Sequence, residues 1–398
     1  MGEWHQITLG DFVSLQRGHD LTESQRQSGC VPIMGSAGLA GYHNAAKAKG
    51  PGVSIGRSGV GSVGVVSYCR TDYWPHNTVL YVTDFHGNDP LFAYYFLKSL
   101  NLRNYDSGSA QSSLNRNYLY PIKMTVPTPK EQRAIAHILG TLDDKIELNR
   151  RMNETLEALA RAIFKSWFVD FDPVRAKMEG RQPVGMDAET AALFPAEFED
   201  SALGLIPKGW KVGPLEEIAD IVMGQSPPGE TYNEEGNGLS FYQGTRDFGF
   251  RFPSRRIYCT APTRFAEKDD VLLSVRAPVG ELNLAIERSA IGRGVAALRL
   301  KPQQGGFLYY LLKETQNGWK KFEAEGTVFG SATKEDVTSF KVIISPAEIR
   351  GNYSEIVDPF DQMIRTNHEE MLTLAALRDT LLPKLLSGEV RVEAVNGL

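Results

Sequence analysis

The chain has 398 residues, 42% of them hydrophobic and 23% charged, so it can bury substantial cores and we expect two or more domains. Its three cysteines, Cys30, Cys69 and Cys259, are odd in number and form no C-x-x-C pair, which argues against a zinc site and a disulfide framework. The sequence has neither a signal peptide at its start nor an apolar run of about 18 residues, which predicts a cytoplasmic protein.

The net charge of −5 is distributed unevenly along the chain. Residues 1–126 hold ten Lys or Arg against eight Asp or Glu, and residues 201–345 hold 18 against 17. The other two blocks are acidic, with ten against 14 in residues 127–200 and five against nine in residues 346–398. The near-neutral blocks can form local basic faces, whereas the acidic blocks are poor candidates to lie against phosphate.

Residues 54–64, SIGRSGVGSVG, carry glycines at the G-x-G-x-x-G spacing of a dinucleotide-binding loop. In such a loop the glycines follow a strand and open a helix that holds the phosphate. Here they lead into the β-branched residues Val65 and Val66, which favour a second strand, and no Lys-Ser or Lys-Thr pair follows as in a P-loop. We therefore interpret the segment as a tight turn between two strands.

The second half of the chain repeats the first at an offset of about 210 residues. Residues 4–18 and 210–224 share Trp, Leu and Gly at the same spacing. Further along, FAYYFLK (92–98) matches FLYYLLK (307–313), and both segments are typical of a buried helix. The repeat predicts two similar domains of mixed α/β (α+β) structure.

The glycine-rich turn also has a counterpart, because GRSGVG (56–61) aligns with VRAPVG (275–280). In this alignment Arg57 coincides with Arg276, and Pro278 stands in place of Gly59. The shared feature is then an arginine on a tight turn and not a phosphate-binding glycine triad.

Each repeat ends at a predicted long helix. TPKE (128–131) and SPAE (345–348) both place a hydroxyl cap, a proline in the first turn and a glutamate that can close a capping box. Apolar residues and asparagines then recur at heptad positions, and polar seam residues fix the register and partner of a coiled coil. We expect the two helices to pair with each other, the alternative being two ordinary amphipathic core helices. The expected pairing residues are Leu142, Ile146, Asn149, Asn153, Leu156, Ile163, Ile364, Asn367, Met371 and Leu374.

These patterns divide the chain into consecutive segments. The segment 171–209 has four prolines and no sustained periodicity, so we interpret it as a partly ordered connector. The predicted segments are a first domain (1–127), a first long helix (128–170), the connector (171–209), a second domain (210–345), a second long helix (346–388) and a C-terminal tail (389–398).

Two segments closely resemble the DNA specificity subunits of type I restriction-modification enzymes. Residues 131–180 and 377–390 are similar to the two helical regions of that family, and the resemblance extends over essentially the whole chain. It implies two target-recognition domains that each read half of a split DNA sequence, separated by two long helices in an antiparallel coiled coil with a pseudo-two-fold repeat. One difference is that the second helical region begins without the Glu-Gln pair of the first.

The resemblance also implies partners and cofactors. The partners would be double-stranded DNA, two modification (methyltransferase) subunits and restriction/translocase subunits, with no membrane. This chain would bind no cofactor itself, and S-adenosylmethionine, ATP and Mg would belong to the partner subunits. The residues agree with a chain that is not an enzyme, because no H-E-x-x-H, G-x-S-x-G or Walker motif is present and no histidines have the spacing of a metal pair.

A domain that reads base edges needs Arg, Lys, Asn, Gln or Ser on loops, together with cations for phosphates. Three clusters qualify: the arginine turn of each repeat, the segment GTRDFGFRFPSRRIY (244–258), and the segment GSAQSSLNRNYLY (108–120) with its counterpart GTVFGSATKEDVTSF (326–340). The segment 244–258 is the best single candidate for phosphate and base contact. Its alternation also suits a two-sided strand with aromatics inward and cations outward, which is the structural alternative and is compatible with binding. The candidate DNA contacts are Arg57, Ser58, Gln111, Asn115, Arg116, Asn117, Arg246, Arg251, Arg255, Arg256, Arg276 and Lys334. Surface ion pairs and turn formation are the alternative roles of these residues.

Three hypotheses of function follow from the sequence. The leading one is a DNA-recognition subunit that positions methyltransferase and restriction subunits on a bipartite site. A docking scaffold or decoy regulator, which binds the modification subunits without productive DNA reading, is the second. An enzyme that binds a nucleotide through the glycine-rich turn is a remote third.

Overall fold

The computed structural model describes residues 4–105, 113–301, 306–322 and 330–392. Contacts divide the chain into two compact units: unit 1 combines Met1–Arg151 with Asn367–Leu398, and unit 2 is Met152–Thr366. The division passes through both long helices, α4 (Pro129–Phe168) and α9 (Ala347–Ser387). Each unit therefore contains one mixed domain and a part of each long helix, a grouping that cuts across the consecutive segments predicted from the sequence. In the described residues no helix is long and apolar enough to cross a membrane.

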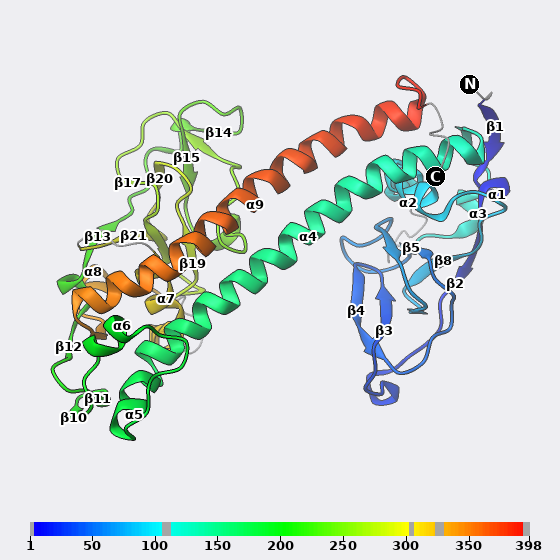
Figure 1. Ribbon diagram of the computed structural model, residues 1–398. Helices are drawn as coiled ribbons and strands as arrows, with labels where there is room; N and C mark the ends of the chain where they lie inside the picture. Colours follow the sequence, from blue (N-terminus) through cyan, green and yellow to red (C-terminus); the bar gives the residue numbers. More distant parts are fainter. Residues whose placement is uncertain (1–3, 106–112, 302–305, 323–329, 393–398) are drawn as a thin grey trace. The chain divides into compact units, whose positions relative to one another are not determined.

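The elements of unit 1 ahead of α4 are β1 (His5–Thr8), α1 (Leu9–Phe12), β2 (Ser14–Arg17), η1 (Glu23–Gln25), β3 (Val31–Gly35), β4 (Gly38–His43), β5 (Gly52–Gly56), β6 (Val66–Cys69), β7 (Trp74–Pro75), β8 (Val79–Asp84), α2 (Pro90–Ser99), η2 (Leu102–Tyr105), α3 (Arg116–Leu119) and β9 (Lys123–Val126). The core rests on an antiparallel sheet in the order β2-β8-β5-β6 (Figure 1). Helix α2 buries Phe92 and Phe96 in one cluster with Ile55 and Leu80 of this sheet. A separate sheet has the order β4-β3-β7, and β1 pairs with β9 just before α4 begins.

The elements of unit 2 between the two long helices are α5 (Asp172–Met178), α6 (Ala188–Leu193), β10 (Phe198–Ser201), β11 (Gly204–Pro207), β12 (Lys211–Pro214), η3 (Leu215–Glu217), β13 (Ala219–Met223), η4 (Gly229–Thr231), β14 (Tyr232–Asn233), β15 (Leu239–Tyr242), η5 (Thr245–Asp247), β16 (Tyr258–Cys259), β17 (Phe265–Ala266), β18 (Val271–Ser274), β19 (Leu282–Leu284), β20 (Ser289–Ile291), β21 (Val295–Leu300), α7 (Phe307–Glu314), η6 (Gln316–Phe322), α8 (Lys334–Thr338) and β22 (Lys341–Ile344). The antiparallel sheet β13-β21-β18-β19 carries the core, and Phe307 of α7 is buried in one cluster with Leu273 and Leu298 of that sheet. A second sheet has the order β14-β16-β15-β20-β17.

The internal repeat is visible in the sheet order. The sheet β2-β8-β5-β6 of unit 1 and the sheet β13-β21-β18-β19 of unit 2 have the same sequence of neighbours, and every pair in both is antiparallel. In both units an antiparallel pair, β1 with β9 and β12 with β22, leads into a long helix. The predicted duplication of a mixed α/β domain is confirmed.

The two long helices pack against each other in antiparallel orientation within unit 1. Arg378 Nη1 donates a hydrogen bond of 2.6 Å to Asp143 Oδ1, and Asn149 Nδ2 donates one of 2.7 Å to Glu370 Oε2. The partner on α9 therefore moves toward the N-terminus as the position on α4 moves toward the C-terminus. This confirms the predicted antiparallel pairing.

Unit 2 shows the same pairing, with Asn153 at its centre. Asn153 is buried, and its Nδ2 donates a hydrogen bond of 3.2 Å to the carbonyl of Ile364. Tyr353 Oη donates one of 3.1 Å to the carbonyl of Ala160. The predicted seam residues are all buried or half-buried: Leu142, Ile146, Asn149, Asn153, Leu156, Ile163, Ile364, Asn367, Met371 and Leu374.

The helix starts were placed correctly from the sequence, but the predicted capping boxes are not formed as expected. The carboxylate of Glu131 accepts hydrogen bonds of 2.8 and 3.1 Å from Arg391. Ser345 Oγ is buried and finds no hydrogen-bond partner in the described part of the chain. In the first helix, Glu131 therefore forms an ion pair with Arg391 in place of the capping interaction that the motif predicts.

The predicted connector is a folded part of unit 2. Residues 171–209 contain α5, α6 and the hairpin of β10 and β11, and they bury Phe171, Val174, Phe194 and Ile206 in the main core. Phe171 packs edge to face against Trp210 at a centroid distance of 5.7 Å. The interpretation as a partly ordered segment was wrong. Aromatic residues of this segment are buried, but they are irregularly spaced, so the sequence shows no periodic pattern that would predict a folded element.

A buried arginine joins the domain of unit 2 to both long helices. Arg251 donates hydrogen bonds of 2.6 Å to Asp361 of α9 and 2.8 Å to Tyr310 of α7, and it lies 3.4 Å from Glu157 of α4. Its side chain is only 1% exposed. Burial disfavours the charged form, but the nearby Asp361 carboxylate and tyrosine hydroxyls outweigh it, so the pKa of Arg251 lies above its ordinary value.

Replacing Arg251 is expected to destabilise unit 2 strongly. The variant Arg251→Met leaves Glu157 and Asp361 buried without their cation, which costs about 3 to 5 kcal/mol. The exposed Arg255, which pairs with Glu287 at 2.9 Å, is the matched control, and Arg255→Met is expected to cost less than about 1 kcal/mol. Urea unfolding of the full chain, followed by the fluorescence of the buried tryptophans, compares the two. Equal midpoints for both variants would contradict the assigned role of Arg251.

Candidate nucleic-acid interface

The glycine-rich segment of unit 1 is a hairpin turn between β5 and β6. Strand β6 follows the glycines and pairs antiparallel with β5, so a strand stands where a dinucleotide-binding loop needs a helix. Gly59, Gly61 and Gly64 have φ angles of 115°, 77° and 81°, which favour glycine over other residues. The interpretation as a strand-turn-strand segment is confirmed.

The corresponding turn of unit 2 joins β18 to β19 and shows that the sequence alignment of the arginines was wrong by one residue. The amide of Leu114 donates to the carbonyl of Arg57 at 2.8 Å, and the amide of Ala332 donates to the carbonyl of Val275 at 2.9 Å. Arg57 is therefore equivalent to Val275. Ser58, not Arg57, occupies the place of Arg276, because the two turns differ in length.

Two of the predicted clusters meet in each unit. Ser58 forms an isolated β-bridge with Ser113 in unit 1, and Arg276 forms one with Ser331 in unit 2. In each unit, the turn that carries Ser58 or Arg276 thus lies beside the polar segment that begins near Ser113 in unit 1 and near Ser331 in unit 2. The turn and the segment are far apart in the sequence. We refer to these neighbouring segments as the repeated pair of loops.

In unit 1, part of the polar segment serves the fold. Asn115 caps α3 by accepting a hydrogen bond of 3.0 Å from the amide of Asn117. Arg116 Nη1 donates to the carbonyl of Leu15 at 2.8 Å. Asn117 is exposed, and Arg57 and Ser58 are half-buried. Gln111 lies outside the described residues.

In unit 2, Thr333 takes the capping role of Asn115 and accepts a hydrogen bond of 3.2 Å from the amide of Asp336. Lys334, the first residue of α8, stands where Arg116 begins α3 in unit 1. Lys334 and Arg276 are both exposed. The same backbone frame therefore displays different polar side chains in the two units.

The segment 244–258 is an irregular loop, so the alternative interpretation as a strand with aromatics inward and cations outward was wrong. Only η5 and the first residue of β16 interrupt it, Phe250 is 50% exposed, and Arg251 is buried. The side chain of Asn283 bonds both the amide and the carbonyl of Gly249 at 3.0 Å, which fixes the loop beside β19. Arg251 is thereby directed to the long helices and is unavailable to a nucleic acid.

The other arginines of this loop differ in how far they are committed to the fold. Arg256 donates to Asp247 at 2.7 Å, and this hydrogen bond raises the pKa of the guanidinium. Arg255 pairs with Glu287 on the surface. Arg246 is exposed. Arg246 is therefore the member of this cluster with the fullest access to a phosphate, whereas Arg256 is held by a buried carboxylate.

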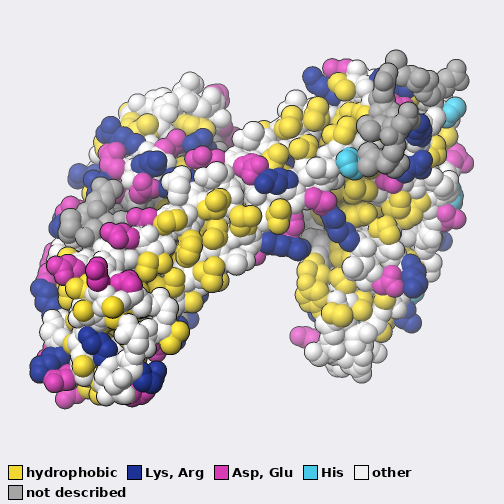
Figure 2. Space-filling view, in the orientation of Figure 1, with side chains coloured by type: hydrophobic (Ala, Val, Ile, Leu, Met, Phe, Trp, Pro, Cys, Tyr) yellow, Lys and Arg dark blue, Asp and Glu magenta, His cyan; other side chains and the backbone are white. Residues whose placement is uncertain are grey.

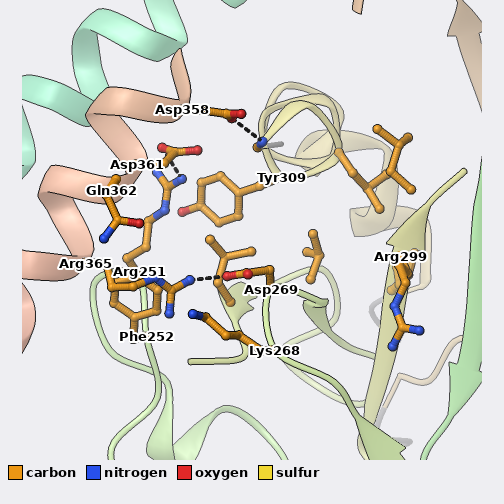
Figure 3. A pocket seen from close by; sticks show the side chains of 16 residues that line it. Arg251, Phe252, Lys268, Asp269, Arg299, Tyr309, Asp358, Asp361, Gln362 and Arg365 are labelled. Carbon is orange, nitrogen blue, oxygen red and sulfur yellow. Dashed lines mark hydrogen bonds and ion pairs between the residues drawn. The ribbon is translucent and has the colours of Figure 1, made fainter. Parts of the chain in front are cut away.

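A cavity of about 300 Å³ lies within unit 2, beside Arg251, between the main sheet and α9 (Figure 3). Two pairs of its charged side chains neutralise each other, because Arg365 forms an ion pair with Asp269 and Arg251 forms one with Asp361. Lys268 and Asp358, which have opposite charges, also line it. Burial raises the pKa of Asp358 at its edge. The cavity has no clear excess of positive charge, so we do not assign it to phosphate binding. The sequence analysis did not identify Asp361 and Arg365 of α9 as part of this site, because in the sequence they resemble ordinary surface charges of a long helix.

The surface offers no single basic face in the orientation of Figure 2, where Lys and Arg are interspersed with Asp and Glu. No group of three or more His, Cys, Asp or Glu gathers to hold a metal ion in the part of the chain that the structure describes.

The comparisons with known proteins agree with the fold. Residues 1–158 and 207–374 match the family described as Type I restriction modification DNA specificity domain. The chain is 30% identical over 317 residues to a protein named as the MjaX type I restriction enzyme specificity subunit of Methanocaldococcus jannaschii, covering 77% of this chain and 69% of that protein. It is 26% identical over 325 residues to the type I restriction enzyme HindI specificity subunit of Haemophilus influenzae, covering 68% of this chain and 69% of that protein.

The fold is similar to that of a crystallised protein of the same kind. The S subunit of a type I restriction-modification system from M. genitalium superposes with a TM-score of 0.66 at 19% identity, covering 97% of this chain and 96% of that one. The family match includes the domains of both units and most of both long helices. The chain therefore belongs to the type I restriction-modification DNA specificity family, which recognises DNA and is not catalytic.

Proposed function

We propose that this chain reads a bipartite DNA sequence, one half with each unit, and positions modification and restriction subunits on it. The observation that carries the proposal is the repeated pair of loops, which has one backbone frame and two sets of side chains. Unit 1 displays Arg57, Ser58 and Asn117, whereas unit 2 displays Arg276 and Lys334. Different donors and acceptors on the same frame would select different bases in the two half-sites.

The long helices offer surfaces for partner subunits. Hydrophobic side chains lie exposed along them (Figure 2). The exposed ones include Leu148 (54%), Leu159 (49%), Met363 (47%) and Leu377 (46%). Asp143 and Asp361 are equivalent in the repeat, because each accepts a hydrogen bond from the second tyrosine of a Tyr-Tyr pair in its domain. Leu159 and Leu377 follow these aspartates by the same number of residues, so they too occupy equivalent positions. Two equivalent apolar surfaces support two copies of a modification subunit. S-adenosylmethionine, ATP and Mg would then be held by the modification and restriction subunits.

Methylation of cellular DNA is the direct test of the proposed function. Cells that express this chain together with its modification subunit are expected to carry N6-methyladenine in one split motif, which single-molecule sequencing of the genome detects. Cells with the modification subunit alone are the control. A complex that forms but leaves no motif would favour the docking scaffold or decoy and contradict DNA reading.

The docking surfaces are tested by placing charge on them. The double variant Leu159→Glu and Leu377→Glu is expected to weaken binding of the modification subunit at least tenfold, because an apolar contact worth about 2 kcal/mol is replaced by a buried charge. Leu205→Glu, on the exposed hairpin strand β11, is the matched control, since Leu205 is 60% exposed. Binding is measured by analytical ultracentrifugation. Unchanged binding of the double variant would exclude these leucines from the interface.

The length of the helices should set the gap between the half-sites. Inserting two heptads into α4 after Arg151 and two into α9 after Thr366 keeps the coiled-coil register and adds about 21 Å. Because one base pair spans about 3.4 Å, the methylated motif is expected to gain several base pairs in its gap. The motif of the lengthened chain is read by the same genome sequencing, and an unchanged gap would refute the idea of a helical spacer.

A further inference from the structure

The tips of the two equivalent turns carry exposed apolar residues. Val60, at the tip of the turn between β5 and β6, is entirely exposed. Ala277 and Pro278, in the turn between β18 and β19, are exposed as well. Both tips stand beside the polar segments bridged by Ser113 and Ser331.

The turn that carries Val60 is held in place by hydrogen bonds. Arg103 donates from its guanidinium to the carbonyls of Gly61 and Val63, the latter at 3.3 Å. Ser62 Oγ donates to Ser36 Oγ at 3.1 Å. The valine is thus presented on a fixed loop, which reduces the entropy lost when it makes a contact.

The turn of unit 2 is fixed in a similar way. Ser274 Oγ donates to the carbonyl of Pro278 at 2.7 Å and accepts from the amide of Glu281 at 2.8 Å. The amide of Ala277 donates to the carbonyl of Gly330 at 3.1 Å, which ties the tip to the neighbouring polar segment. Two diverged sequences therefore hold a small apolar tip at the same place.

Apolar character at these tips contributes nothing to the folded core. A single exposed apolar residue is ordinary on a protein surface. Here, however, the feature recurs at equivalent positions of both units, on restrained loops, next to the side chains proposed to read bases. A contact made outside the chain accounts for all three properties.

We infer that the two loop tips contact the 5-methyl groups of thymines, one in each half-site. The C5-methyl of thymine is the distinctive apolar group among the hydrogen-bonding groups that base edges present in the major groove. Val60 supplies two methyl groups, and Ser58 and Arg57 stand beside it to bond neighbouring polar edges or phosphates. The inference rests on the proposed function, and it adds an apolar element to a recognition surface that is otherwise polar.

The test replaces each thymine of the two half-sites by deoxyuridine, which lacks only the methyl group. Duplexes carrying the split motif are titrated with the complex of this chain and its modification subunit, and binding is followed by fluorescence anisotropy. Loss of one buried methyl corresponds to about a fourfold weaker binding. We expect one deoxyuridine position in each half-site to show this loss.

Variants assign the effect to the valine. Val60→Ala should weaken binding to the thymine duplex and abolish the deoxyuridine effect in the first half-site, while the effect in the second half-site persists as an internal control. Val60→Thr, which keeps the shape but replaces one methyl by a hydroxyl, should weaken binding in the same direction. Val184→Ala, at an equally exposed valine between α5 and α6, should change neither value.

The outcomes separate this inference from the proposed function. A split methylation motif whose binding is insensitive to every deoxyuridine overturns the thymine contact and leaves DNA reading intact. A deoxyuridine effect that persists in Val60→Ala overturns the assignment to Val60. Absence of any split motif removes both proposals together.

Discussion

A tyrosine hydroxyl hydrogen-bonded to an aspartate on a long helix fastens each domain to the helical pair. In unit 1, Tyr95 of α2 donates to Asp143 of α4 at 2.6 Å. In unit 2, Tyr310 of α7 donates to Asp361 of α9 at 2.8 Å. Both tyrosines are the second of a Tyr-Tyr pair in equivalent helices, so the duplication has preserved the joint while the loops diverged. In each unit, the position of the domain relative to the helices depends on this joint.

In the two joints, different arginines form the ion pair with the aspartate. Arg378, from the partner helix α9, binds Asp143 in unit 1, whereas Arg251, from the domain itself, binds Asp361 in unit 2. In unit 2, where the Arg251 side chain is only 1% exposed, breaking the pair leaves an uncompensated buried charge, which makes that joint costly to open. The pair of unit 1 is more exposed, at 21% for Arg378 and 27% for Asp143. In unit 1 the cation also ties the two helices to each other, and in unit 2 it ties a loop of the domain to both helices. Equivalent geometry has thus been reached with unlike residues.

The sequence predicts those features that depend on local or periodic signals. The helix starts follow from the prolines at 129 and 346, and the seam follows from apolar and asparagine residues at heptad spacing. The turn at 57–65 follows from β-branched residues after the glycines. Each of these signals lies within a few residues of the feature that it predicts.

The features that the sequence analysis did not predict depend on contacts between residues that are distant in the sequence. Arg251 is buried because Glu157 and Asp361, 94 and 110 residues away, surround it, and nothing within 244–258 distinguishes it from the exposed Arg246. Arg276 is equivalent to Ser58 in the repeat and not to Arg57. The sequence does not show this, because the two turns differ in length and only the hydrogen bonds to the neighbouring segments fix their alignment. The folding of 171–209 onto unit 2 depends on Trp210 and the helix residues that receive its aromatic side chains.

The distribution of the two units along the chain has a consequence for synthesis on the ribosome. Unit 2 is continuous, from Met152 to Thr366, whereas unit 1 is split between the two ends of the chain. Unit 2 can therefore finish folding as soon as it emerges, while the first domain waits for the last turns of α9, which bury Leu385 and Leu386 in its core. Until then the side of α4 that packs against α9 in unit 1 is uncovered, so a chain that terminates early would display it to chaperones and proteases.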